Sequence, residues 1–156
     1  MKLFLSLVMT LTTLIGQDLT DYQRQCLTKA IAIAKPYQLG NTIAGIIWVE
    51  SKCVYKVNPV TGDYGITQVN IKSLLNRLEL PTTTLNKSFY ATQLVTEDAY
   101  AVKAALAELL YWQLDRKRTG WYHLVGSYNQ GNVIESNNYA SKVANAIRYL
   151  KQQGVL

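Results

Sequence analysis

Glu50 is the side chain in this sequence that is best placed for acid–base chemistry. It ends an apolar helical run that begins at Ile43, and Ser51 follows it directly. The carbonyl dipoles at the end of a helix and the apolar residues one turn back both disfavour an ionised carboxylate, so we expect a raised pKa for Glu50. A carboxyl group that stays protonated near neutral pH can act as a general acid. A surface glutamate at a frayed helix end is the alternative interpretation.

The stretch GDYGITQVN, residues 62–70, carries polar groups that could line a site near Glu50. Gly65 would let the backbone approach a ligand closely, and the amides of Gln68 and Asn70 suit sugar hydroxyls and N-acetyl groups. Asp63 is the nearest candidate for a second carboxylate, which ordinary glycosidases require. It also fits a simple turn residue, because Thr-Gly-Asp is common turn chemistry.

Two later segments add polar and aromatic side chains. Tyr128 and Asn129 precede Gln-Gly-Asn at a polar helix end that can face a cleft, and Tyr139 begins the final helix. The Ser51 hydroxyl could orient a substrate or cap its helix, and no Ser-His-Asp arrangement is present to make it a nucleophile. No combination of cysteines and histidines matches a metal site, so we expect neither a metal nor a cofactor.

The elements that must position these residues are predicted to be helices. Their expected first residues or caps are Thr20-Asp21, Asn41, Asn70, Thr96, Trp121 and Asn137. Pro81 is expected to end the helix that follows Asn70, and Thr119-Gly120 the long helix from Thr96. Residues 82–95 give no clear pattern. The fold is therefore predicted to be mainly α, with a small β element near residues 62–69.

The overall composition fits one globular domain. The 156 residues are 49% hydrophobic and 17% charged, which allows a real core and excludes a disordered chain. The net charge of +6 is compatible with nucleic acid, a membrane surface or an anionic wall polymer. Because the basic residues are scattered, and the densest cluster stands where a helix should end, we expect no nucleic-acid partner.

Residues 1–16 differ from the rest of the chain. Lys2 precedes an apolar run from Leu3 to Ile15, which is shorter than the roughly 20 residues that span a bilayer. This pattern is typical of a secretory signal peptide, although no A-x-A cleavage site is present. An uncleaved anchor or a buried first helix is the alternative. We expect residues 17–156 to form the single mature domain.

The sequence contains two cysteines, Cys26 and Cys53. In an exported protein they could form a disulfide bond between the first mature helix and the loop after Glu50. Two buried free thiols are the alternative.

Four segments in a fixed order resemble a known family. Glu50-Ser51, GDYGITQVN, GSYNQGN and NYASKV look like the soluble lytic transglycosylase domain of the goose-type-lysozyme superfamily, over about residues 21–152. The chain is most similar to small exported enzymes that accompany secretion, conjugation and pilus systems, and phage wall-degrading proteins carry similar domains. The resemblance implies a lysozyme-like α+β fold, peptidoglycan glycan strands as the substrate, a monomer, and a periplasmic or virion-associated and cell-envelope location.

The resemblance also implies a reaction. The β-1,4 bond between N-acetylmuramic acid and N-acetylglucosamine would be cleaved to a 1,6-anhydromuramoyl product. Glu50 would protonate the glycosidic oxygen and then take the proton from the muramic C6 hydroxyl, which attacks its own C1. Two other functions stay open: a hydrolytic lysozyme in which Asp63 positions a water, and a wall-binding or assembly module with little catalysis.

The substrate-binding residues are implied by their positions in the matching segments. They are Ser51, Gly65, Ile66, Gln68, Asn70, Tyr128, Asn129 and Tyr139. Tyr139 matches a tyrosine whose hydroxyl points toward the catalytic glutamate. Thr67 stands where the family usually has methionine, which would remove an apolar contact with sugar or peptide. Ser127 replaces a usual alanine.

Overall fold

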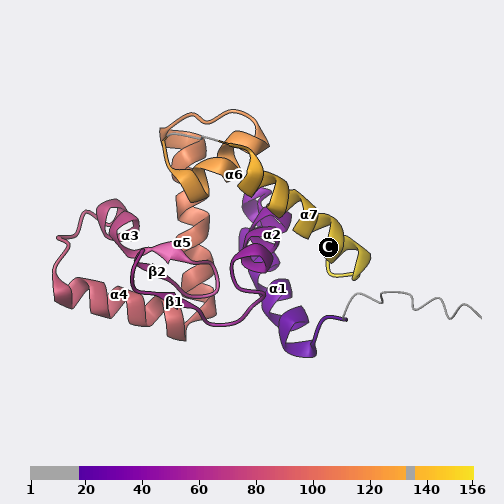
Figure 1. Ribbon diagram of the computed structural model, residues 1–156, viewed down its shortest axis with the longest axis horizontal. Helices are drawn as coiled ribbons and strands as arrows, with labels where there is room; N and C mark the ends of the chain where they lie inside the picture. Colours follow the sequence, from indigo (N-terminus) through magenta and orange to yellow (C-terminus); the bar gives the residue numbers. More distant parts are fainter. Residues whose placement is uncertain (1–17, 133–135) are drawn as a thin grey trace, which may run out of the picture.

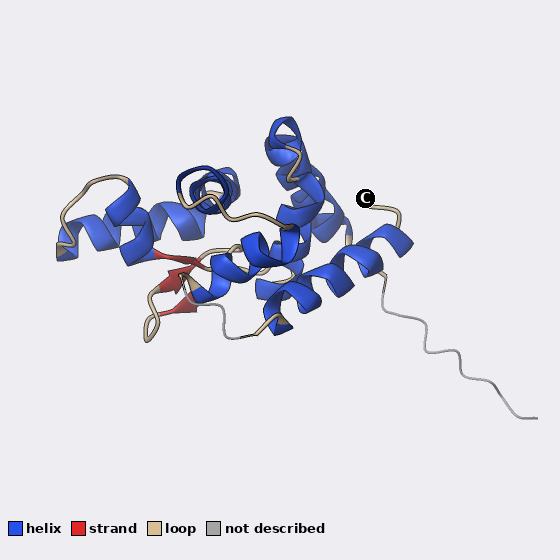
Figure 2. Ribbon diagram, turned by 90° about the horizontal axis from the view of Figure 1, so that it is seen from above, coloured by secondary structure: helices blue, strands red, loops and turns tan. Residues whose placement is uncertain are grey.

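The computed structural model describes residues 18–132 and 136–156, which form seven α-helices and one small sheet (Figure 1, Figure 2). The predicted signal segment, residues 1–16, lies outside the described residues. Within the described part of the chain, no helix combines the length and apolar character needed to cross a membrane. The helices and short helical segments are α1 (Asp21–Ala34), η1 (Lys35–Tyr37), α2 (Gly40–Glu50), α3 (Ile71–Arg77), α4 (Thr84–Thr96), α5 (Asp98–Leu110), η2 (Tyr111–Asp115), α6 (Trp121–Gln130) and α7 (Asn138–Gln152).

The helix α5 stands between two groups of elements (Figure 1). The sheet, α3 and α4 lie on one side of it, and α1, α2 and α7 lie on the other. The small sheet orders its strands β1 (Val57–Asn58), β2 (Asp63–Tyr64) and β3 (Val69–Asn70), all antiparallel. This confirms the small β element, which extends from residue 57 to 70 rather than from 62 to 69.

The start of α1 follows the predicted capping pattern. The Thr20 hydroxyl accepts a hydrogen bond from the Gln23 amide, and the Gln23 side chain accepts one from the Thr20 amide. Together they form a capping box, which satisfies two backbone donors that a helix start otherwise leaves free. The predicted start at Asp21 is confirmed.

Packing, and not a cap, fixes the start of α2. The expectation that Asn41 caps this helix is wrong, because α2 begins at Gly40 after Leu39, without a side-chain cap. A Cβ on Gly40 would meet the Ile31 side chain and carbonyl at 3.2 Å, so a glycine allows α1 and α2 to approach closely here. Gly45 does the same against α7, where a Cβ would lie 2.7 Å from Ile147. Helix α2 is therefore held on two sides, and its last residue is Glu50.

The boundaries between residues 71 and 120 differ from those predicted. The helix after Asn70 ends at Arg77 and does not reach Pro81, and α4 occupies the stretch that gave no clear pattern. Thr83 caps α4 by accepting from the Asn86 amide at 3.2 Å. The long helix begins at Asp98, not at Thr96, and continues after Leu110 as the π-helical segment η2, which ends before Thr119-Gly120.

Candidate active site

Glu50 lies at the C-terminal end of α2, where the chain leaves the core. Burial is the largest influence on its carboxyl group and raises the pKa above the ordinary 4.5. The hydrogen bond from Tyr139 and the positive charges of Lys56 and Lys142 act in the opposite direction, and the Asp63 charge raises the pKa further. The net shift is upward, which is the direction expected from the sequence, and burial is its main cause.

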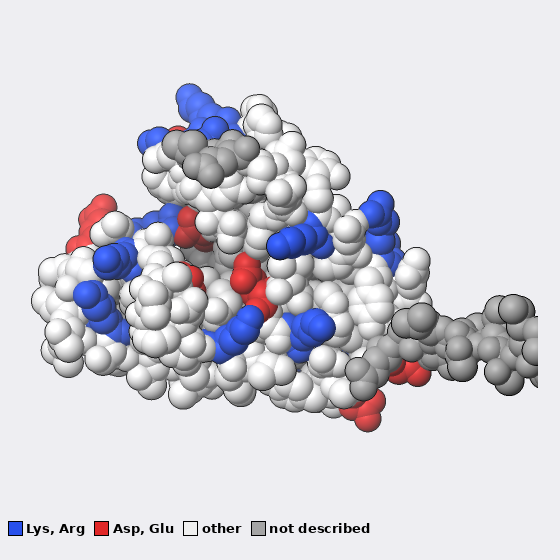
Figure 3. All heavy atoms as spheres, viewed as in Figure 1, with Lys and Arg blue, Asp and Glu red and all other residues white. Residues whose placement is uncertain are grey.

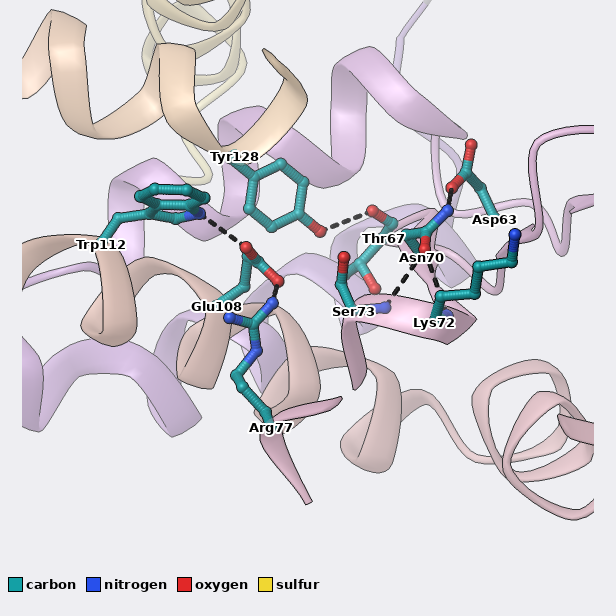
Figure 4. A network of polar contacts seen from close by, with 9 residues as sticks. All are labelled: Asp63, Thr67, Asn70, Lys72, Ser73, Arg77, Glu108, Trp112 and Tyr128. Carbon is teal, nitrogen blue, oxygen red and sulfur yellow. Dashed lines mark hydrogen bonds and ion pairs between the residues drawn. The ribbon is translucent and has the colours of Figure 1, made fainter. Parts of the chain in front are cut away.

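Two tyrosines stack beside this carboxyl group. The Tyr139 hydroxyl donates a 2.6 Å hydrogen bond to Oε1 of Glu50. The Tyr128 ring stacks on the Tyr139 ring, with centroids 6.5 Å apart and planes inclined by 15°. The Tyr128 hydroxyl donates to the Thr67 carbonyl at 2.7 Å (Figure 4). Burial raises the pKa of both phenols, so both remain hydrogen-bond donors near neutral pH.

Ser51 holds the end of α2 against the loop that follows β2. Its buried hydroxyl donates to the Ile66 carbonyl at 2.7 Å and accepts from the Cys53 amide at 3.1 Å. Of the two roles considered for Ser51, the structure supports the capping role. Lys56 adds a second restraint by donating to the Glu50 backbone carbonyl at 2.9 Å.

The polar residues of the sheet form one hydrogen-bonded group. The Asn70 amide donates to Oδ1 of Asp63 and to the Thr61 carbonyl, both at 2.9 Å, and Thr61 donates to the other Asp63 oxygen at 2.5 Å. The Asn70 side-chain oxygen caps α3, as predicted (Figure 4). The Gln68 amide donates to the carbonyls of Gly65 and Lys56 at 2.9 and 3.1 Å, so its direction is fixed.

Three residues expected to contact substrate have other positions. Ser51 and Ile66 are buried, and neither they nor Gly65 line the cavity beside Glu50. Gly65 has a φ of +80°, and a Cβ there would lie 2.2 Å from the Leu94 carbonyl oxygen. The glycine is therefore needed for packing against the end of α4. These three residues therefore pack beneath the residues that line the cavity and hold the surrounding backbone in place.

Thr67 also points away from the cavity. Its side chain is fully buried and donates to the Ala101 carbonyl of α5 at 3.1 Å. The Thr67 side chain therefore makes no contact with the cavity beside Glu50, and the effect of Thr67 on substrate preference stays a prediction. Its carbonyl, which fixes the Tyr128 hydroxyl, is what reaches the site.

A cavity of about 620 Å³ gathers most of the predicted site residues. Glu50, Asp63, Gln68, Asn70, Tyr128 and Asn129 line it. Tyr139 lines an adjacent cavity of about 330 Å³, which shares Glu50 and Asn129 with the first. In the space-filling view the surface is hollowed beside the sheet, and acidic side chains lie around the hollow (Figure 3). The volume and the polar lining suit an extended polar ligand such as a glycan.

The same cavity also holds a buried glutamate, Glu108, that was not predicted from the sequence. Glu108 of α5 pairs with Arg77 of α3 and accepts a 2.6 Å hydrogen bond from the Trp112 indole (Figure 4). Glu108 and Trp112 both line the cavity. The sequence does contain one indication of this pair of residues: a glutamate stands on the apolar face of α5, one helical turn before a tryptophan.

Comparison with protein families identifies the chain. The model described as the transglycosylase SLT domain matches residues 29–151. The chain belongs to the SLT transglycosylase family. No curated protein and no solved structure gives a significant match to this chain. The SLT match confirms the resemblance drawn from the four segments and the mainly α, lysozyme-like fold class.

Membership of the SLT family supports a transglycosylase activity on peptidoglycan, and with it an exported or envelope location. The matched range begins within α1 and ends within α7, so it covers Glu50, the cavity and Tyr139.

Proposed function

We propose that this SLT domain is a lytic transglycosylase in which Glu50 is the catalytic acid and base. The observation that carries the proposal is the position of Glu50: its carboxyl group has a raised pKa, lines a polar cavity and is held by Tyr139 at 2.6 Å. Such a group can donate a proton near neutral pH and then be stabilised as a carboxylate.

The proposed reaction has two proton transfers. Glu50 first gives its proton to the oxygen that links N-acetylmuramic acid to N-acetylglucosamine, and the bond from C1 to that oxygen breaks. The muramic C6 hydroxyl then attacks C1, and the Glu50 carboxylate takes the proton of that hydroxyl. The product is 1,6-anhydromuramic acid at the new chain end, and Glu50 is again protonated.

Opposed influences on Glu50 support both roles. Burial favours the protonated form, whereas the Tyr139 hydroxyl and the Lys56 charge favour the carboxylate. A carboxyl group balanced in this way changes its protonation state at a small cost in free energy, which a group that is acid and then base requires.

Product analysis tests the proposal. Purified peptidoglycan sacculi are digested with the wild-type protein and with Glu50→Gln, and the released fragments are identified by mass spectrometry. We expect anhydromuramoyl ends from the wild type and at least a hundredfold slower release from Glu50→Gln, since acid–base catalysis contributes about 10²–10⁴-fold. The matched control is Glu97→Gln, which changes an exposed glutamate outside the cavity. Unchanged release by Glu50→Gln would favour a wall-binding or assembly module.

Hydrolysis with Asp63 as a water-positioning carboxylate is the second candidate function. One observation favours it: Asp63 lines the same cavity as Glu50. Both Asp63 oxygens already accept hydrogen bonds from Thr61 and Asn70, which suits a structural role in the sheet. Reducing-end muramic acid in place of the anhydro product, lost in Asp63→Asn, would establish hydrolysis and reject the transglycosylase.

We further propose that residues 1–16 direct export and that the enzyme opens the wall locally for a secretion, conjugation or virion machine. The support is the signal-like pattern of these residues and the resemblance to small enzymes of such systems. A fusion of residues 1–20 to a reporter active only outside the cytoplasm tests export. An inactive reporter would contradict it.

A further inference from the structure

The cleft continues past the proposed catalytic residue toward Glu108. Glu50 is shared by the main cavity and the smaller cavity beside Tyr139. Glu108 and Trp112 are shared by the main cavity and a third cavity of about 600 Å³, which includes Arg77 but not Glu50. The main cavity therefore adjoins the Tyr139 cavity at Glu50 and the third cavity at Glu108.

The carboxyl group of Glu108 is held in one orientation. The Arg77 guanidinium and the Trp112 indole each contact a different carboxylate oxygen, and Arg77 itself lies over the Tyr111 ring, 4.9 Å from its centroid. A buried ion pair of this kind is weak evidence for stability, because desolvation offsets the attraction. A carboxylate has about four acceptor positions, so lone pairs remain for a ligand in the cavity.

Ser127 supplies a second polar group at this cavity. Ser127 is buried at the wall of the main cavity, and its hydroxyl has no hydrogen-bond partner among the described residues. A buried hydroxyl without a partner destabilises the fold. A hydroxyl that lines a ligand cavity can receive that partner from the ligand.

We propose that Glu108 and Ser127 bind an acetamido group of a sugar remote from the cleaved bond. An acetamido group carries one N–H donor and one carbonyl acceptor. Glu108 accepts from the N–H, and the Ser127 hydroxyl donates to the carbonyl. The Trp112 indole keeps the carboxylate oriented through its own N–H. This inference rests on the proposed function, because it requires that the cleft take a glycan strand.

The same arrangement discriminates against a de-N-acetylated sugar. An ammonium group offers the Ser127 hydroxyl no carbonyl to donate to, and Arg77 already neutralises the Glu108 charge that would attract a cation. The site therefore selects N-acetylated glycans. Because it is remote from the cleaved bond, it also favours strands that are long enough to reach it.

Binding measurements in a Glu50→Gln background test the proposal without requiring cleavage. Isothermal titration with N-acetylglucosamine oligomers from two to six units gives the affinity for each length. We expect Ser127→Ala to weaken binding of the longer oligomers about fivefold, the worth of one hydrogen bond, and to leave the dimer unaffected. The unfolding midpoint of Ser127→Ala should stay the same or rise, because the variant removes a buried unpartnered hydroxyl. Ser88→Ala, at an exposed position of α4, is the control.

A second variant removes the acceptor without leaving a buried charge. Glu108→Leu alone strands the Arg77 guanidinium and is expected to destabilise the protein, so the double variant Arg77→Met with Glu108→Leu is used instead. The double variant should weaken the binding of long oligomers about tenfold and reduce the preference for N-acetylated over de-N-acetylated oligomers.

Three results would overturn the inference: no measurable binding by the parent, unchanged binding in both variants, or equal losses for the dimer and the longer oligomers. The proposed function fails separately, if the wild type releases no anhydromuramoyl product while both variants still weaken glycan binding.

Discussion

The Tyr139 hydroxyl donates a 2.6 Å hydrogen bond to Glu50 across 89 residues of sequence. The donor is the second residue of α7 and the acceptor is the last residue of α2. The two helices pack along each other through Gly45 and Val143. The close approach permitted by Gly45 therefore sets the position of the hydroxyl relative to the carboxyl group. The contact opposes the effect of burial on Glu50, since a donor favours the carboxylate.

Tyr139→Phe removes this donor and keeps the ring. A hydrogen bond to a charged group contributes about 1.5–3 kcal/mol, so we expect kcat/KM on peptidoglycan to fall by about tenfold or more. The pKa of Glu50 should rise further, and the alkaline limb of the activity profile should move to higher pH. Tyr37→Phe, at an exposed tyrosine remote from the cavity, is the control. An unchanged pH profile in Tyr139→Phe would show that the bond does not tune Glu50.

The raised pKa of Glu50 predicts two pH effects with the same sign. Activity should fall as pH rises through this pKa, because the acid form donates the first proton. Stability should fall in the same window, since a carboxyl group with a higher pKa in the folded state than in the unfolded state favours folding only while it is protonated.

The stability effect can be isolated with Glu50→Gln, which cannot ionise. Thermal unfolding of this variant and of the wild type is compared from about pH 4 to pH 8, and we expect the variant to gain stability relative to the wild type as pH rises. A difference that is constant with pH would contradict the raised pKa.

Local chemistry made part of the fold predictable. The Thr20 cap and the Asn70 cap each follow from a side chain within a few residues of the backbone groups that it satisfies. The short helix from Trp121 to Gln130 has no side-chain cap and is bounded by two glycines, Gly120 and Gly131. Glu50 at the end of α2 was predictable for the same reason, because the apolar run before it has a helical period.

The features that could not be predicted from the sequence depend on packing between elements that are distant in the chain. Helix α4 buries one residue of its own, Leu94, so it shows almost no apolar period. The Glu108 ion pair depends on Arg77, which another helix supplies, and its position in the cleft could not be read from α5 alone. Gly65 was identified from the sequence as a special glycine, but the Leu94 carbonyl, which requires a glycine there, comes from an element distant in the chain.

Gly65→Ala is expected to be among the most destabilising substitutions near the site. Positive φ alone costs an alanine roughly 1–2 kcal/mol, and the 2.2 Å approach to the Leu94 carbonyl adds a backbone clash of about 1–3 kcal/mol. Gly154→Ala is the matched control, since Gly154 also has a positive φ but nothing within 4 Å of a Cβ. Urea unfolding of the two variants measures the difference. Equal losses of stability would show that packing against α4 does not require the glycine.

The two buried cysteines, in α1 and in the loop after Glu50, lie near enough that each is the largest influence on the pKa of the other. We predict that an oxidising compartment converts them to a disulfide bond, with both thiol protons released and two electrons passed to the oxidant. Closing the loop from Cys26 to Cys53 should stabilise the fold by about 3.5 kcal/mol, through the reduced entropy of the unfolded chain.

The measurement is the unfolding midpoint of the protein oxidised with glutathione disulfide, with and without a reductant, together with its intact mass. Cys26→Ser should abolish both the mass change and the dependence on reductant. Because Cys53 donates its backbone amide to Ser51, the bond should also restrain the end of α2, and oxidation should slow hydrogen exchange at that amide. An oxidised protein that keeps two free thiols would contradict the prediction.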